Sequence, residues 1–550
     1  MARMRLLKRF LPSMAIFVIL VAVLATLSAA MMPGWNVEPL TQHIKVASPD
    51  SAIQARNTKT AQEGTYQVKT TNLRIKLAPN VTINAILRSP VGAPGKRPAT
   101  LFIHGAGTGK ASEVYGDIAS AMSSAGIVTL VPDKRLDTYT TFHRDYYVMA
   151  EDYMTSLRTL QAQPDVDPTQ AGIYAESEGT WIAEAMAHRH PSVISFMMLT
   201  SPPAVSGRRQ MAMAANTYVD AVGAPKGLNR DVNKFIGLDF APLGLQYADF
   251  PAERYLKDLT MPLLISFGTN DLSMPIEQGA TDIVEATKTV GNRNVLVRYY
   301  RANHQMRVGA HTSVPGLPLD THYTHDLEDW TNAIAVGTKA DGWITPQIAG
   351  DQPHQRLAVP ASVKPGLIES LNTILVLLAA IVLCAAMAGI VGICIAIGHV
   401  RQRSKQDSSS PTDKNLAIQT STKTTRVRLS WGDSAHSRFP RRLTTALVLN
   451  SCCAVLSIAM FFAYVVIAAT SALTLTSQGT LLTWGWMLMQ VIALANVALF
   501  TWLIMELWRS RGKQFQGFWT PAHFIVAALC VIAAMISLVM MAFFGLYALL

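Results

Sequence analysis

The sequence predicts an α/β domain, with a mostly parallel sheet and helices on both faces, joined to an all-α transmembrane region. In the first two thirds of the chain, short apolar runs alternate with segments of helical periodicity, which is the pattern of βαβ units. Polar side chains that could carry chemistry follow several of these runs, as they do at the carboxyl ends of parallel strands. The last third contains uninterrupted apolar stretches long enough to cross a bilayer, which takes about 20 residues.

The predicted sheet begins with a hairpin-like pair of strands. Polar and apolar residues alternate at 66–69 and 73–77, and a Pro79-Asn80 turn leads into 81–87. Further strands are expected at 99–103, 127–131, 171–174, 262–268 and 295–300, and helices at 112–124 and 147–162.

Prolines and glycines interrupt this pattern between about 202 and 259, which is the natural position for a cap over the carboxyl ends of the strands. The cap has aromatic and aliphatic side chains that could line an acyl pocket or form the cap's own core: Tyr218, Phe235, Phe240 and Leu245.

Ser177 lies between a strand-like run that ends at Ala175 and a helical pattern at 180–187. This is the layout of a nucleophile elbow, in which a sharp strand-to-helix turn exposes the serine Oγ. Small residues two before and two after the serine, here Ala175 and Gly179, avoid a steric clash. The backbone N–H of Glu178 would then lie at a helix N-terminus and face an oxyanion. A serine in this position can also serve only as a helix N-cap.

A glycine-bearing loop follows the strand expected at 99–103. It reads His104-Gly105-Ala106-Gly107, and such a loop lets a backbone N–H, here that of Ala106, approach a reacting carbonyl. We expect His104 to support the loop rather than act as a base. We also expect the Glu178 side chain to be an acid at a helix N-terminus and not a catalytic group.

Two further candidates follow later strands, Asp271 after 262–268 and His304 after 295–300. The order Ser177, Asp271, His304 is that of one hydrolase fold. In these roles His304 is the general base, Asp271 orients it, and the amides of Glu178 and Ala106 form the oxyanion hole. Asp271 could instead cap the next helix. The rival acids and histidines are Asp249, Asp258, His311, His322 and His325.

The stretch from about 65 to 336 resembles the α/β-hydrolase superfamily, and within it the esterase and S9-peptidase-like branch. The resemblance rests on the Ser-Glu-Gly elbow and on an Asp133-Lys134-Arg135 turn after the fourth strand. One departure is that the first elbow position is Ala175 instead of glycine. The resemblance implies an α/β-hydrolase fold with a cap insertion.

The chain carries a formal net charge of +11, and the excess concentrates in the N-terminus, in 399–442 and in 509–513. Threading the apolar stretches in order places these three segments on one side, as the positive-inside rule favours. The N-terminus would then lie inside, the hydrolase domain outside, and the C-terminus outside. The basic loop at 399–442 could bind nucleic acid, but cytoplasmic anchoring accounts for its charge, and we expect no nucleic-acid partner.

Five apolar stretches are expected to span the membrane: Leu11–Met32, Ile374–Ile397, Ala446–Ala469, Leu481–Leu503 and Phe524–Leu550. The first could also be a cleaved secretory signal. The resulting organisation is an anchor or signal peptide at 1–32, a polar tether at 33–63, a hydrolase domain at 64–340, a linker at 341–372, and four transmembrane helices at 373–550. All five cysteines fall in the spans, so the exported domain has no disulfide and no Cys/His zinc spacing.

The sequence therefore predicts a membrane-anchored, extracytoplasmic serine hydrolase that cleaves acyl esters through an acyl-enzyme, in the cell membrane of a bacterium. Its expected partners are an ester or lipid-like small molecule and the lipid bilayer, and no cofactor or metal is expected. An S9-like peptidase or an acyltransferase could use the same three residues. A non-catalytic membrane sensor or assembly protein is the alternative of another class.

Overall fold

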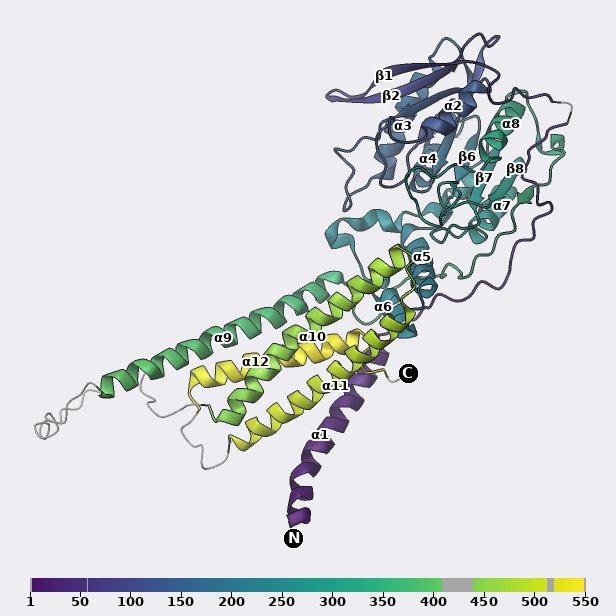
Figure 1. Cartoon of the computed structure of the whole chain (residues 1–550). Helices are drawn as coiled ribbons and strands as arrows, with labels where there is room; N and C mark the ends of the chain where they lie inside the picture. Colours follow the sequence, from purple (N-terminus) through teal and green to yellow (C-terminus); the bar gives the residue numbers. More distant parts are fainter. Residues whose placement is uncertain (1, 57, 408–438, 512–518, 549–550) are drawn as a thin grey trace, which may run out of the picture. The chain divides into compact units, whose positions relative to one another are not determined.

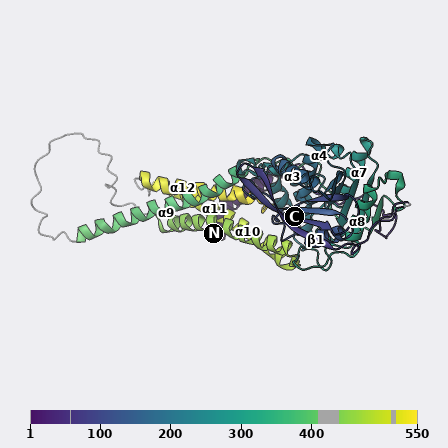
Figure 2. The same ribbon diagram turned by 90° about the horizontal axis from the view of Figure 1, so that it is seen from above.

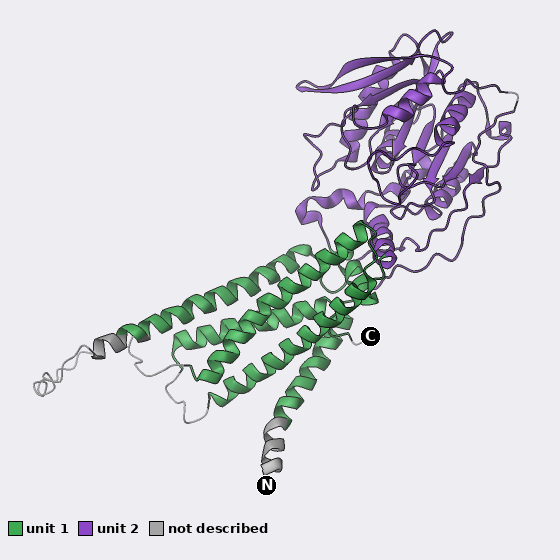
Figure 3. Ribbon diagram, viewed as in Figure 1, with its two compact units in different colours: residues 1–33, 222–238, 365–550 green, residues 34–221, 239–364 purple. Residues whose placement is uncertain are grey.

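The computed structural model describes residues 2–56, 58–407, 439–511 and 519–548. The chain forms two compact units, which are coloured separately in Figure 3. Residues 34–221 and 239–364 make up the sheet unit, and residues 1–33, 222–238 and 365–550 make up the helical unit. Most of the basic loop at 399–442 lies outside the described residues.

The sheet unit is built on one mixed sheet, to which the described residues contribute nine strands in the order β1-β2-β4-β3-β5-β6-β7-β8-β9. The strands are β1 (Val68–Ala78), β2 (Val81–Pro90), β3 (Arg97–Ile103), β4 (Val128–Pro132), β5 (Val166–Glu176), β6 (Met197–Thr200), β7 (Leu263–Gly268), β8 (Val295–Tyr300) and β9 (Ile348–Gly350). The pairs β1–β2 and β2–β4 are antiparallel, and the other pairs are parallel. The predicted hairpin and mostly parallel sheet are thus confirmed.

Helices cover both faces of this sheet, and alternate residues of one strand show it. Leu101 and Ile103 of β3 belong to a core with α3 (Tyr146–Gln161), α4 (Glu178–Arg189) and α7 (Gln278–Thr289). Phe102, between them, belongs to a second core with α2 (Gly116–Ser124) and α8 (Tyr323–Ala335). Because successive strand side chains point to opposite faces and helices cover both, β3, β7 and β8 are mainly apolar and are buried along most of their length. Figure 1 shows the helices around this sheet.

The segments on either side of the predicted hydrolase domain differ from a tether and a linker. Within 33–63, Pro39 forms a β-bridge with Leu357 and Ala55 forms one with Trp343. Residues 348–350 of the expected linker are strand β9, which pairs with β8. Residues 34–63 and 341–364 therefore belong to the sheet unit, because the two segments pair with each other and with the edge of the sheet.

The expected cap at 202–259 is divided between the two units. Helix α5 (Gly207–Ala221) belongs to the sheet unit, whereas α6 (Lys226–Gly237) belongs to the helical unit. Short 3₁₀ turns follow at η1 (Ala241–Leu243), η2 (Leu245–Asp249), η3 (Ala252–Arg254) and η4 (Leu256–Asp258), and η5 (Ala340–Gly342) lies after α8. Phe235, one of the expected cap residues, stacks on Phe544 with ring centroids 5.9 Å apart, so it belongs neither to an acyl pocket nor to a core of the cap alone.

Besides α6, the helical unit contains α1 (Ala2–Ala30), α9 (Leu371–Asp407), α10 (Arg441–Leu473), α11 (Gly479–Arg509) and α12 (Pro521–Phe543). Among the described residues, five helices are long and apolar enough to cross a membrane: Leu11–Ala30, Leu371–Gly398, Arg441–Leu473, Gly479–Arg509 and Pro521–Phe543. Helix α10 packs against α11 and α12, and α9 packs against α12 (Figures 1 and 2). Asn450 Nδ2 donates to Leu499 O across α10 and α11, at 3.0 Å, so a polar side chain joins two apolar helices.

Candidate active site

Ser177 occupies a strained turn between β5, which ends at Glu176, and α4, which begins at Glu178. Its φ of 55° and ψ of −122° are rare for a residue with a side chain. A Cβ at Gly179 would lie 2.8 Å from Ile103 O, so only glycine fits there. Within the described structure the Ser177 side chain makes no capping hydrogen bond to α4, which removes the N-cap explanation for this serine. The turn has the geometry expected of a nucleophile elbow.

Asp271 and His304 lie together, although 33 positions separate them in the sequence. The His304 Nδ1–Asp271 Oδ2 distance is 2.7 Å, with the Asp271 side chain fully buried and that of His304 20% exposed. Burial alone would lower the pKa of His304, but the neighbouring Asp271 carboxylate, assisted by Glu176, raises it above its ordinary value. The second Asp271 oxygen accepts from Ser273 N at 2.7 Å. Asp271 does not cap α7, whose N-cap residue is Glu277.

The rival acids and histidines have other partners. Asp258 contacts His188 at 2.8 Å, and Asp249 pairs with Arg208 at 2.6 Å. The exposed His311 contacts Asn270 O at 3.3 Å. His322 and His325 are also exposed and lie at the start of α8. The strands β5, β7 and β8 run parallel through β6, so Ser177, Asp271 and His304 all follow strand ends at one edge of the sheet.

The glycine-bearing loop approaches the elbow closely. A Cβ at Gly105 would lie 3.2 Å from Glu176 O and 3.4 Å from Ser177 Cβ, so the absence of a side chain permits the approach. Ala106, the next residue, is exposed, and Gly107 has a φ of 77°. His104 is buried, its Nε2 lies 2.7 Å from Pro132 O, and burial lowers its pKa to about 4. A neutral, hydrogen-bonded His104 supports the loop.

Glu178 is an acid in the first turn of α4, as expected, but its side chain has buried partners that the sequence did not indicate. It is buried and accepts hydrogen bonds from Tyr139 Oη at 2.7 Å and Tyr146 Oη at 2.9 Å. Arg144 Nη1 also forms an ion pair with it. As the first residue of α4, Glu178 has a backbone N–H without a partner in the helix. The buried cluster therefore holds the helix terminus at which this amide lies.

Lys134 links this cluster to the glycine-bearing loop. Its Nζ donates to Gly105 O at 2.6 Å and lies 3.5 Å from Glu178 Oε2. Burial lowers the pKa of Lys134 to about 8, against the opposing effect of Glu178. The Asp-Lys-Arg turn signalled a position in the fold, but nothing in the sequence indicated the two contacts of this lysine.

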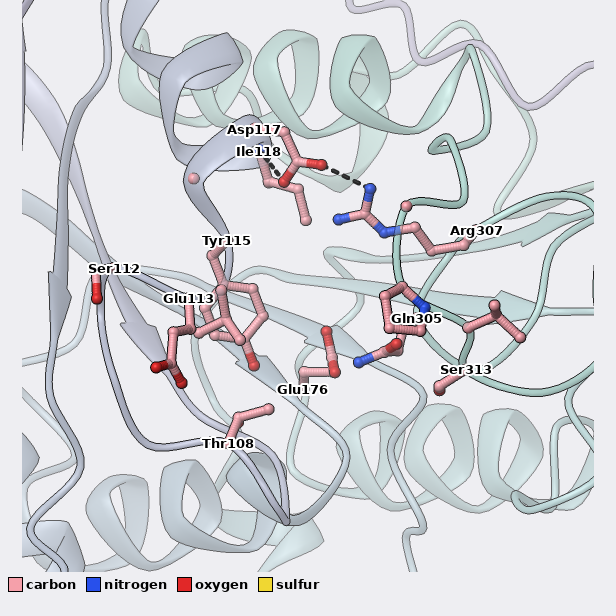
Figure 4. A pocket seen from close by; sticks show the side chains of 15 residues that line it. Thr108, Ser112, Glu113, Tyr115, Asp117, Ile118, Glu176, Gln305, Arg307 and Ser313 are labelled. Carbon is pink, nitrogen blue, oxygen red and sulfur yellow. Dashed lines mark hydrogen bonds and ion pairs between the residues drawn. The ribbon is translucent and has the colours of Figure 1, made fainter. Parts of the chain in front are cut away.

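A cavity of about 520 Å³ opens beside the elbow (Figure 4). Glu176 and Gln305 line it, together with residues of the loop and helix at 108–118 and of the loop at 313–316. Neither residue was identified from the sequence patterns. The one feature that could have indicated them is their position in the sequence, since Glu176 precedes Ser177 and Gln305 follows His304. The expected acyl-pocket residues of the cap are not among those that line this cavity.

Away from this site, a second group of side chains could ligate a metal ion. Glu63, His325 and Glu328 bring potential ligand atoms within 4.8 Å of one another. They lie on and beside α8 and take no part in the geometry around Ser177.

No family model and no curated protein sequence matches this chain. Solved structures resemble it over about half its length. The match to Est1E from Butyrivibrio proteoclasticus has 16% identity, covers 48% of this chain and 97% of that one, and gives a TM-score of 0.34. The match to an acylaminoacyl peptidase from Pyrococcus horikoshii has 18% identity, covers 50% of this chain and 42% of that one, and gives a TM-score of 0.35. The match to a dienelactone hydrolase from Anabaena variabilis has 18% identity, covers 48% of this chain and 97% of that one, and gives a TM-score of 0.32. These structural neighbours are α/β-hydrolases.

Proposed function

We propose that this chain is a serine hydrolase that cleaves acyl esters with Ser177 as nucleophile, His304 as general base and Asp271 as the group that orients His304. The observation that carries the proposal is the contact between the buried Asp271 carboxylate and His304 Nδ1, at the sheet edge where Ser177 occupies its strained turn. A buried acid that holds one imidazole nitrogen leaves Nε2 free to act as a base.

The reaction follows from these roles. Ser177 Oγ attacks the ester carbonyl while His304 Nε2 takes its proton, and the amides of Glu178 and Ala106 stabilise the oxyanion. The carbon–oxygen bond to the alcohol then breaks, and His304 returns the proton to the leaving alkoxide. Water, deprotonated by His304, attacks the acyl-enzyme, and the acid leaves as Ser177 regains its proton. Asp271 stabilises the imidazolium in both halves of the cycle.

We also propose that the apolar helices anchor the enzyme in a bacterial cell membrane, with the sheet unit outside the cytoplasm. Five described helices have the length and composition of membrane spans. The positive segments at the N-terminus, at 399–442 and at 509–513 favour the cytoplasmic side. The lipid bilayer is then a partner of the helical unit, and an ester or lipid-like molecule is the substrate of the sheet unit.

The test is labelling of the full chain in detergent with a fluorophosphonate, combined with turnover of 4-nitrophenyl acetate. Ser177→Ala should abolish labelling and turnover. Ser195→Ala is the matched control, because this serine precedes β6 and its hydroxyl contacts Thr169 O and Ala171 O, both at 2.9 Å. Labelling that persists in Ser177→Ala contradicts the assignment of Ser177 as nucleophile, and a wild type with neither labelling nor turnover leaves a non-catalytic sensor as the better account. Faster cleavage of an aminoacyl anilide than of the matching ester favours a peptidase, and transfer to an added alcohol without hydrolysis favours an acyltransferase.

A further inference from the structure

Two residues beside the proposed catalytic groups line the same cavity. Glu176 precedes Ser177, and Gln305 follows His304. The Gln305 amide hydrogen-bonds the Glu176 carboxylate. Figure 4 shows this carboxylate between Tyr115 and Gln305, facing the space below Arg307. A molecule in the cavity therefore lies next to the site where an ester would react.

The charges that line the cavity are mainly negative. Glu113, Asp117 and Glu176 are acidic, and Arg307 is the basic residue among the cavity-lining side chains. Arg307 Nη1 is paired with Asp117 Oδ2 at 2.7 Å and donates to Leu317 O at 3.1 Å. Its positive charge is thus already matched by Asp117, and Glu113 is matched at the surface by Lys110 at 3.0 Å.

Glu176 is the acid in the cavity without such a match. It is only 6% exposed, and within the described residues no lysine or arginine lies at ion-pair distance from it. Burial raises the pKa of Glu176, and this effect outweighs the opposing effects of His304, Gln305 and Arg307. A buried carboxylate is costly unless a cation or enough hydrogen bonds compensate it, and Gln305 supplies one hydrogen-bonding side chain.

The surroundings of Glu176 suit a small cation better than an acyl chain. Tyr115 lines the cavity beside Glu176, and its Oη accepts a hydrogen bond from Gly105 N at 3.3 Å. The Tyr115 ring and the Glu176 carboxylate are neighbours in the lining of the cavity (Figure 4). Carboxylate and aromatic groups together bind ammonium groups by charge, hydrogen bonding and cation–π attraction.

We propose that this cavity binds a protonated amine of the substrate, close to the scissile ester bond, with Glu176 as its counter-ion. The proposal rests on the proposed ester hydrolysis and assigns its substrate class: amino esters, with the amine on either the acyl or the alcohol side.

The experiment compares esters that differ only in the amine. On the acyl side these are L-alanine methyl ester, lactate methyl ester and propionate methyl ester. On the alcohol side they are 2-(dimethylamino)ethyl acetate and 3-methylbutyl acetate. The full chain, Glu176→Gln and the control Glu285→Gln are assayed near pH 7, where an α-amino group with a pKa of about 7.7–8.0 is mostly protonated. Glu285 is exposed on α7 and does not line the cavity, so its substitution removes the same charge elsewhere.

The readout is the ratio of kcat/KM between the amine ester and its neutral partner, measured within each variant. We expect a preference of about 10- to 100-fold for the amine in at least one pair, as a hydrogen bond to a charged group provides. Glu176→Gln should reduce this ratio to within about threefold of unity, whereas Glu285→Gln should keep it. Fluorophosphonate labelling of Glu176→Gln reports that the elbow is intact.

Each of three results would overturn the inference while leaving ester hydrolysis standing. They are equal turnover of amine and neutral esters by the wild type in both pairs, a preference that survives Glu176→Gln, and a preference that Glu285→Gln removes as completely as Glu176→Gln does. Failure to hydrolyse any of the esters, with no labelling, contradicts the proposed function itself and this inference with it.

Discussion

Replacement of Lys134 by methionine separates catalysis from stability in this protein. Lys134 Nζ contacts both Gly105 O, at 2.6 Å, and Glu178 Oε2, at 3.5 Å. The proposed oxyanion amides belong to Glu178 and to Ala106, which follows Gly105. Lys134 is therefore a positioning residue that holds the two amides at a fixed separation. Methionine has nearly the same length but neither the charge nor the donors.

The expected effects of Lys134→Met on kcat and on the free energy of unfolding follow from these contacts and from the pKa of Lys134. Complete loss of one oxyanion donor costs about 10²–10³ in rate, and a displaced donor should cost less, about 10- to 100-fold in kcat. The lowering of the Lys134 pKa from 10.5 to about 8 corresponds to about 3 kcal/mol against the charged amine in the folded protein. Glu178 keeps Arg144, Tyr139 and Tyr146 as partners. Lys134→Met should thus change the free energy of unfolding by less than about 2 kcal/mol, because lost hydrogen bonds and relieved desolvation offset each other.

The assay is the pH dependence of kcat and KM for 4-nitrophenyl acetate, with thermal unfolding measured in parallel. Because the folded pKa of Lys134 is about 8, wild-type kcat should fall above about pH 8 as the amine loses its proton. Lys134→Met should have the lower kcat throughout, an unchanged KM and no such alkaline fall. Arg135→Met is the control, since Arg135 pairs with Asp137 at 2.7 Å and not with Gly105 or Glu178. A kcat for Lys134→Met within twofold of wild type at every pH refutes the positioning role.

Three other predictions concern different parts of the chain. Asp271→Asn should keep the fold but lower kcat by roughly 10⁴, as in related triads, because the amide stabilises the wrong His304 tautomer; far-UV circular dichroism with kinetics checks this. Burial raises the pKa of Glu328 from 4.5 to about 8, so between these two pH values the folded state holds a proton that the unfolded state has lost. The free energy of unfolding should therefore fall as the pH rises from 4.5 to about 8. Glu328→Gln should therefore raise Tm at pH 8 and leave it unchanged at pH 4; equal shifts at both values would contradict the argument. A cysteine introduced at Ser409, outside the described residues, should react with an impermeant maleimide only from the cytoplasmic side. A reporter enzyme fused after Leu550 should be active only on the opposite side of the membrane.

Several features of this protein could be predicted because short stretches of sequence encode them. The elbow at Ser177 combines a buried strand, small neighbours and a helical pattern within about 15 residues. The strands β3, β7 and β8 are short, mainly apolar runs because helices cover both of their faces. The helices that are long and apolar enough to cross a membrane need only an uninterrupted apolar run. Placement of Asp271 and His304 at one sheet edge follows from parallel strands ending on the same side.

Other features depend on contacts between distant segments, and only the tertiary structure decided them. Glu178 reads as a helix-terminal acid, yet Lys134 and Arg144, more than 30 positions away, bury it in an ionic cluster. Residues 33–63 are polar and look like a tether, but they form bridges with positions some 300 residues later. Residues 222–238 belong to the helical unit although they lie inside the expected cap. The composition of a single segment indicates how much of it can be buried. Which other segment packs against it depends on how the whole chain folds.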